Sequence, residues 1–198
     1  MSRRTRALGG ILAAVALILV APNAFAQVES GPWKTWNPGF NVQQVGCGSA
    51  SGSTFKLTCS SSSGEQRAER RYDTYSSGTH QFQGSFKINS MGGSRISLKQ
   101  TFNENSGPFF LLGVEAGGRM YDVEGGATIS GGAVVGTTVR VNTVNQVVKS
   151  HRTYINGSLK NTVSTPGGSY YDKIGAYRTS TGQGPISVTW SNVQFWTK

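Results

Sequence analysis

Two short segments about a hundred residues apart carry the side chains best suited to chemistry, Arg67-Ala-Glu-Arg-Arg71 and Tyr171-Asp-Lys-Ile-Gly-Ala-Tyr177. Successive side chains of a strand point to opposite faces, so alternate residues of each segment would share one face if both are strands. A face that holds fixed cations and phenols is a poor core, but it suits an anionic polymer. The alternatives are a surface ladder of ion pairs and an ordinary half-buried strand tyrosine.

The elements that must position these residues are predicted to be strands. After residue 26 the hydrophobic runs are short, are bounded by Gly, Asn or Ser, and often alternate with period two, as in residues 80–88 and 186–190. Asn156-Gly157, flanked by strand-like residues, predicts a two-residue hairpin turn. About ten strands at this spacing predict an all-β fold, an antiparallel β-sandwich of the jelly-roll type.

Residues 1–26 have the pattern of an export signal. Three arginines within the first six residues precede an apolar run at 11–20, and Ala24-Phe25-Ala26 is a small-residue cleavage site. We expect a chain that is secreted, extracellular or periplasmic, with no membrane partner after cleavage near Gln27. An uncleaved anchor is the alternative, and the cleavage site argues against it. Residues 27–198 are long enough for a single domain with its own core.

The charge balance favours an acidic partner. Without the three arginines of the leader, 16 Lys and Arg face nine Asp and Glu, a net charge of +7. On an exported protein this surplus suggests an acidic polysaccharide or another polyanion, or a basic surface that has no partner. Nucleic acid is not expected, because the chain has no run of mixed basic and aromatic residues and is predicted to leave the cell.

Cys47 and Cys59 are the two cysteines of the chain. An even pair in an exported protein, separated by a Gly- and Ser-rich stretch, predicts a disulfide that closes a loop or hairpin. In the chain-entropy model a loop of this length contributes about 3 kcal/mol. No His, Asp and Glu cluster has the spacing of metal ligands, so neither a catalytic metal nor another cofactor is expected.

Four motifs in consistent order resemble those of alginate-lyase and glucuronan-lyase-like polysaccharide lyases, and the resemblance extends over residues 65–196. The family has an R-x-E-x-R strand, a following strand, a Q-x-H strand and a Y-F-K-x-G-x-Y strand. The matching segments are 67–71, 75–84, 99–102 and 171–177. The resemblance implies a concanavalin-like jelly roll whose concave sheet holds a substrate groove. It also implies β-elimination of a polyuronate, which leaves an unsaturated uronate at the new end.

The resemblance also implies roles for individual residues. Removal of the C5 proton of a uronate is the hard step, because the neighbouring carboxylate resists the developing negative charge. Arg67 and Gln100 would neutralise that carboxylate, and Tyr177 would transfer protons. Glu69 would orient the flanking arginines, with its pKa depressed by them. The remaining substrate-binding candidates are Glu69 itself, Arg71, Lys173, Tyr171 and Lys99.

The sequence departs from the family pattern at one position. Phe102 stands where the family has its histidine, and a phenyl ring cannot accept a proton. His80 could supply a base from another strand, although its parity with Phe82 favours a structural role. Gln100 has the parity of an apolar set, so without a bulge it would face the core instead.

Two other functions remain open from the sequence. A non-catalytic binding module would explain Phe102, since plant citrate-binding proteins resemble this family and share the Gln-x-Phe version of the strand. A glycoside hydrolase would need paired carboxylates, for which Glu115, Asp122 and Glu124 lie close in sequence. We expect a monomer in either case.

Overall fold

The computed structural model describes residues 27–60, 64–123, 126–179, 182 and 184–198. The predicted signal peptide, residues 1–26, and the hydrolase candidate Glu124 therefore lie outside the described residues. The described part of the chain folds into fifteen strands and contains no helix. No described segment forms a helix long and apolar enough to cross a membrane.

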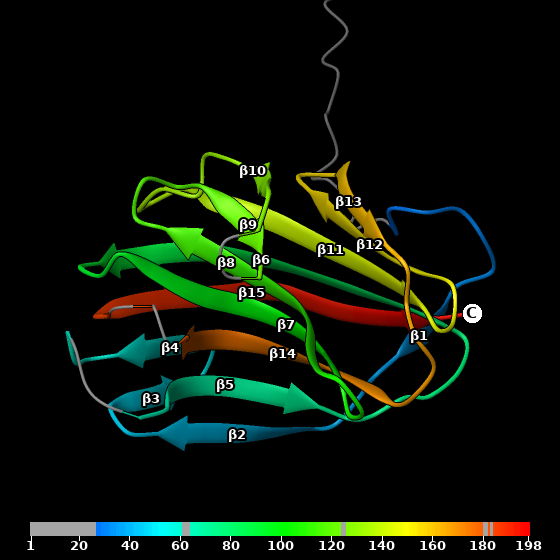
Figure 1. Ribbon diagram of the computed structural model, residues 1–198, viewed down its shortest axis with the longest axis horizontal. Helices are drawn as coiled ribbons and strands as arrows, with labels where there is room; N and C mark the ends of the chain where they lie inside the picture. Colours follow the sequence, from blue (N-terminus) through cyan, green and yellow to red (C-terminus); the bar gives the residue numbers. More distant parts are fainter. Residues whose placement is uncertain (1–26, 61–63, 124–125, 180–181, 183) are drawn as a thin grey trace, which may run out of the picture.

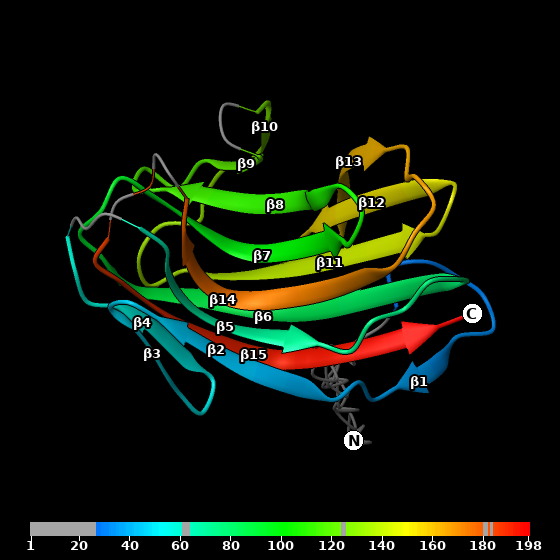
Figure 2. The same ribbon diagram turned by 60° about the horizontal axis from the view of Figure 1, so that its bottom comes forward.

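The strands form two antiparallel sheets that pack as a sandwich (Figures 1 and 2). The eight-stranded sheet contains, in spatial order, β13 (Ser158–Val163), β12 (Ser150–Ile155), β11 (Thr138–Gln146), β6 (Thr79–Met91), β15 (Ile186–Thr197), β4 (Thr54–Leu57) and β3 (Gly48–Ser51), with β1 (Lys34–Trp36) also paired to β15. The seven-stranded sheet contains β10 (Thr128–Ser130), β9 (Met120–Asp122), β8 (Gly107–Glu115), β7 (Arg95–Asn103), β14 (Tyr170–Arg178), β5 (Gln66–Tyr72) and β2 (Phe40–Val45). The predicted all-β sandwich is confirmed.

The hydrophobic core lies between the two sheets and follows from the alternation of apolar side chains. Both sheets contribute inward-facing aromatic and branched residues that are almost completely buried. The largest of them are Phe55, Phe82, Phe86, Phe110 and Trp190. Because every second residue of a strand faces this core, the other residues of the seven-stranded sheet are left for a surface.

Two local predictions are also confirmed. Asn156 and Gly157 connect β12 to β13 with φ angles of 51° and 84°, the left-handed conformation that a tight hairpin turn needs. Cys47 and Cys59 are joined by a disulfide, with their Cα atoms 5.9 Å apart. The disulfide closes the base of the hairpin formed by β3 and β4, as expected from the spacing.

Candidate active site

The two chemistry-bearing segments are neighbouring strands. β5 and β14 pair in an antiparallel register that places their polar faces side by side in the middle of the seven-stranded sheet. The directly opposed pairs on this face are Arg67–Tyr177, Glu69–Gly175 and Arg71–Lys173. The two motifs are about a hundred residues apart in the sequence, and the pairing of their strands makes them one surface.

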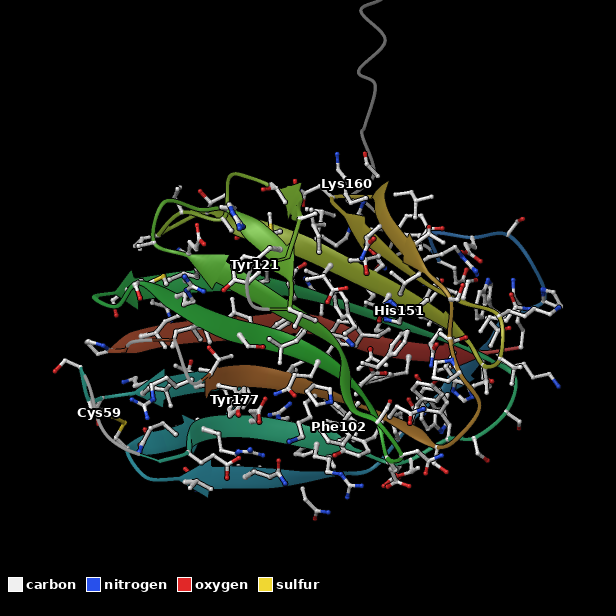
Figure 3. All side chains as sticks on the ribbon, in the orientation of Figure 1. Cys59, Phe102, Tyr121, His151, Lys160 and Tyr177 are labelled. Carbon is white, nitrogen blue, oxygen red and sulfur yellow. A yellow bond between two sulfur atoms is a disulfide. The ribbon has the colours of Figure 1, made fainter. Side chains whose placement is uncertain are left out.

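A groove of about 520 Å³ lies over this surface. It is lined by Gln43, Glu65, Arg67, Arg71, Gln100, Phe102, Pro108, Tyr171, Lys173 and Tyr177. Six of the predicted site residues are in that set. Figure 3 shows Tyr177 and Phe102 on the seven-stranded sheet. The groove is therefore built from β2, β5, β7, β8 and β14, with cations and aromatic rings on its floor.

Gln100 reaches the groove because β7 contains an irregularity. The register of β7 against β8 shifts between Ser97 and Lys99, so that Leu98 and Lys99 both point into the interior. Such a bulge reverses the alternation for the residues that follow it. Gln100 and Phe102 consequently face the groove, although they have the sequence parity of the buried Leu98.

The same bulge removes Lys99 from the groove, which corrects its expected role in substrate binding. Its side chain is fully buried between the sheets, where its ammonium donates to Asp172 and, at 2.8 Å, to Thr101. The hydroxyl of Thr101 lies 3.2 Å from Nε2 of His151. Burial lowers the pKa of Lys99, and the Asp172 carboxylate opposes that shift. This buried network joins the two sheets, and its one contact with a groove residue that the structure describes is the 3.1 Å hydrogen bond from the Lys99 ammonium to the backbone carbonyl oxygen of Gln100.

Glu69 lies beneath the groove floor and is 2% exposed, so its carboxylate is covered by neighbouring groups and is not open to a ligand in the groove, contrary to its expected place among the substrate-binding residues. Its Oε1 accepts a 2.6 Å hydrogen bond from Gln100, and its Oε2 lies 3.5 Å from Lys173 Nζ and 3.8 Å from Arg67. Burial raises the pKa of Glu69 in spite of these cations, which corrects the predicted depression. Burial also lowers the pKa of Lys173, because desolvation disfavours both charges.

Gly175 is required by the backbone of the neighbouring strand. Its φ angle of 146° is one that L side chains rarely adopt, and a Cβ there would collide with the carbonyl oxygen of Ala68. Gly175 is directly opposite Glu69 in the register of β14 and β5, next to the Gln100–Glu69 hydrogen bond.

Arg67 is the cation nearest to the candidate catalytic phenol. Its guanidinium carbon lies 4.9 Å from the ring centroid of Tyr177, and its Nη1 lies 3.4 Å from the Gln43 amide oxygen. The exposed carboxylate of Glu65 forms an ion pair with the same guanidinium. Glu65 therefore occupies the position on Arg67 that an anionic ligand would take.

The other end of the groove is an aromatic platform. The rings of Phe102 and Tyr171 stack with centroids 4.9 Å apart and an interplanar angle of 13°. The Arg71 guanidinium lies 4.0 Å from the Tyr171 centroid and 3.3 Å from a carboxylate oxygen of Glu104. Burial raises the pKa of Tyr171, with Arg71 opposing the shift. Tyr171 is thus held between a ring and a cation.

Neither histidine of the chain reaches the groove. His80 lies on β6 in the opposite sheet, where it stacks on Tyr75 at 3.8 Å and its Nε2 lies 2.9 Å from the Ser77 carbonyl oxygen. The expectation that His80 supplies a base is corrected, because the sandwich separates it from the substrate face. His151 is fully buried between the sheets.

The chain matches no protein-family model and none of the curated proteins significantly. An alginate lyase from Corynebacterium sp. superposes with a TM-score of 0.62 over 72% of this chain and 75% of that one, at 19% identity. The alginate lyase AlgAT5 from polysaccharide lyase family 7 superposes with a TM-score of 0.60 over 80% and 82%, at 20% identity. An alginate lyase from Pseudomonas aeruginosa gives 0.59 over 79% and 86%, at 17% identity.

The fold is that of the alginate lyases. At these identities the likeness establishes the architecture, and the activity has to be argued from the groove itself. Three residues that line the groove were not among those expected from the sequence. They are Gln43, Glu65 and Pro108. The alternation of β5, continued to the residue just before the strand, could have identified Glu65, two residues before Arg67. No signal in the sequence marked Pro108.

Of the carboxylates proposed for a hydrolase, the structure describes Glu115 and Asp122, and each has partners of its own. Glu115 lies 3.6 Å from Arg119 at the end of β8. Asp122 accepts from the Leu111 amide at 3.1 Å and from Asn161 at 3.3 Å, and it lines a separate cavity of about 250 Å³. Among the residues that the structure describes, no three His, Cys, Asp or Glu side chains gather to hold a metal ion.

Proposed function

We propose that the chain is a polysaccharide lyase that cleaves an acidic polyuronate by β-elimination in this groove. One observation carries the proposal: Arg67, Gln100, Lys173 and Tyr177 line a single groove although they come from three strands. Guanidinium, amide, ammonium and phenol groups on one floor match the needs of a uronate, which presents a carboxylate, hydroxyls and an acidic C5–H. Two of the structures similar to this chain are alginate lyases, which agrees with this substrate class.

The C5 carboxylate of the sugar binds between Arg67 and Gln100. One N–H of Gln100 donates to Glu69, which leaves its second N–H for the carboxylate. The guanidinium of Arg67 gives the stronger, charge-assisted contact once the substrate has displaced Glu65. Together they stabilise the extra negative charge that develops when the C5 proton leaves.

Tyr177 transfers both protons. Its phenolate oxygen takes the proton from C5, and the electrons of that bond form the C4–C5 double bond as the C4–O4 bond breaks. The phenol then returns a proton to the departing O4. The Arg67 guanidinium lies beside its ring, so the phenol and the carboxylate-binding cation are neighbours. Tyr171, the other groove phenol, is packed between Phe102 and Arg71 and serves as a binding surface.

A single phenol on one side of the ring restricts the substrate. It can take the C5 proton and protonate O4 only if both project from the same face of the sugar. This holds for β-linked mannuronate and glucuronate, whereas α-linked guluronate presents them on opposite faces. We therefore propose mannuronate-rich alginate or glucuronan as the substrate.

We also propose that the protein acts outside the cytoplasm as a monomer. The predicted leader, the surplus of cations in the mature chain and the Cys47–Cys59 disulfide all support export. The groove is formed by one chain, so the scheme needs no second subunit.

A non-catalytic binding module is the second candidate, and Phe102 favours it. With phenylalanine at the histidine position of the family, the groove retains its anion-binding side chains but has fewer groups that transfer protons. Binding without turnover would be the result.

Ultraviolet absorbance from unsaturated ends, measured together with reducing sugar, separates these functions. The mature protein is incubated with polymannuronate, polyglucuronate, polyguluronate and a neutral β-glucan. Absorbance with the first two substrates that disappears in Tyr177→Phe, but persists in Tyr154→Phe on the opposite sheet, supports the lyase. Reducing ends without absorbance would overturn it, and binding without either signal would establish the module.

A further inference from the structure

A second cavity, of about 290 Å³, lies between β1 and β15 of one sheet and β2 and β5 of the other. We call it the edge cavity. Figure 2 shows β1 beside the C-terminal part of β15, where the chain crosses from β1 to β2. Its lining residues are Thr35, Trp36, Asn37, Pro38, Phe40, Arg70, Tyr72 and 193–196.

The edge cavity and the groove use opposite faces of the same strand. On β5, Arg67 and Arg71 line the groove, whereas Arg70 and Tyr72 line the edge cavity. Alternation alone separates the two sets. The two cavities have no lining residue in common, so a ligand in one leaves the other free.

One buried donor in the edge cavity, Nε of Arg70, has no hydrogen-bond partner among the described residues. The hydroxyl of Tyr72, whose residue is 5% exposed, has a hydrogen-bonding interaction only with the Arg70 guanidinium beside it in the described part of the chain. Burial raises the pKa of Tyr72, and its hydrogen bond and charge interaction with Arg70 oppose the shift. A buried donor without an acceptor is costly and uncommon, so Nε of Arg70 points to an absent acceptor beside the Tyr72 hydroxyl.

The walls of the edge cavity are aromatic. Phe40 is 48% exposed, its ring lies 5.7 Å from that of Tyr72, and the Arg70 guanidinium carbon lies 4.4 Å from its centroid. An exposed phenyl ring at the mouth offers a flat apolar surface next to a cation. The volume is at the lower limit for ligand sites, which suits one sugar ring and excludes a longer segment.

We propose that the edge cavity binds a single uronic acid residue. Its carboxylate accepts from the Arg70 guanidinium and the Tyr72 hydroxyl, and the apolar face of its ring packs against Phe40. The net charge of +7 on the predicted mature chain complements such a ligand. The proposal is independent of turnover in the groove, because none of its three residues takes part in the elimination.

Titration of the ¹⁵N-labelled mature protein with sodium D-glucuronate, followed by amide shifts, tests the proposal. We expect shifts at Phe40, Arg70 and Tyr72 that saturate. Tyr72→Phe removes one hydroxyl and should weaken this binding about tenfold, as expected for a hydrogen bond to a charged group. Phe40→Ala, at a half-exposed position, is a second variant that the fold should tolerate, and it should weaken binding as well.

Further arms identify the ligand chemistry. D-Glucose has no carboxylate, so it tests whether binding needs one. Citrate has carboxylates but no sugar ring, so it tests whether the ring is needed. Glucuronate binding that clearly exceeds both supports the site. Equal shifts with glucose, equal affinity for citrate, unchanged binding in Tyr72→Phe, or shifts confined to groove residues such as Gln100 would each overturn it. The groove variant Lys173→Gln should leave the titration of the edge cavity unchanged.

Discussion

Gln100 donates a 2.6 Å hydrogen bond to Glu69 from the far side of an intervening strand. β14 lies between the strands that carry these residues, and the hydrogen bond crosses it diagonally next to Gly175. The bond orients the Gln100 amide, because the N–H group must point toward the Glu69 oxygen that accepts it. We therefore expect Glu69 to act through the groups it holds, without contacting a substrate.

Glu69→Gln should lower kcat/KM on polymannuronate by about 10²-fold, a loss typical of misplaced catalytic groups. The carboxylate that holds Gln100 and Lys173 would be lost, while Tyr177 would remain. Steady-state kinetics across pH should show a reduced kcat with an unshifted profile. A rate equal to that of the wild type would contradict the positioning role, and a loss as complete as in Tyr177→Phe would indicate that Glu69 is itself the base.

Phe102→His should extend activity to polyguluronate. The imidazole would lie beside Tyr171 in the groove and could take a C5 proton from the face that Tyr177 does not serve. General base catalysis contributes about 10²-fold or more, so absorbance from polyguluronate should rise by that order. Phe102→Asn is the matched control, since it removes the stacked ring without adding a base. Equal rates in both variants would argue against the single-phenol scheme.

Glu65→Gln should strengthen polyuronate binding up to about fivefold, because an exposed ion pair is worth at most about 1 kcal/mol. The variant frees Arg67 from its internal carboxylate. Affinity is measured with the inactive Tyr177→Phe background and polymannuronate. Glu115→Gln changes the net charge equally at a residue that does not line the groove, and it should have little effect. An equal gain in affinity in both variants would show that the change in net charge, and not the release of Arg67, causes the effect.

His151 should make the folded state less stable in acid. Burial lowers its pKa well below the usual 6.5, and Lys99 and Arg152 add to this shift. Below pH 6.5 the unfolded chain binds a proton that the folded chain excludes. The free energy of unfolding therefore falls with decreasing pH, by about 1.4 kcal/mol per unit from this residue.

Urea unfolding of the wild type and of His151→Gln between pH 7.5 and 5 measures this contribution. As the pH falls, the wild type should lose more free energy of unfolding than the variant does. A difference that stays constant across this range would show that His151 is protonated in the folded state.

The sequence and the tertiary structure contributed different parts of the site. Alternation is a local property of a strand, so the sequence alone determined that Arg67 and Arg71 share a face, as do Lys173 and Tyr177. The jelly-roll sandwich and the disulfide were predictable for the same reason, since turn residues, periodicity and cysteine spacing are all local signals.

Only the tertiary structure decided the rest. The bulge in β7, which places Gln100 in the groove and Lys99 in the core, depends on pairing with β8. The raised pKa of Glu69 depends on how deeply three strands bury it, which outweighs the cations that the sequence places nearby. The separation of His80 from the groove depends on its assignment to the opposite sheet. Register and burial arise from contacts between distant segments, which no local pattern contains.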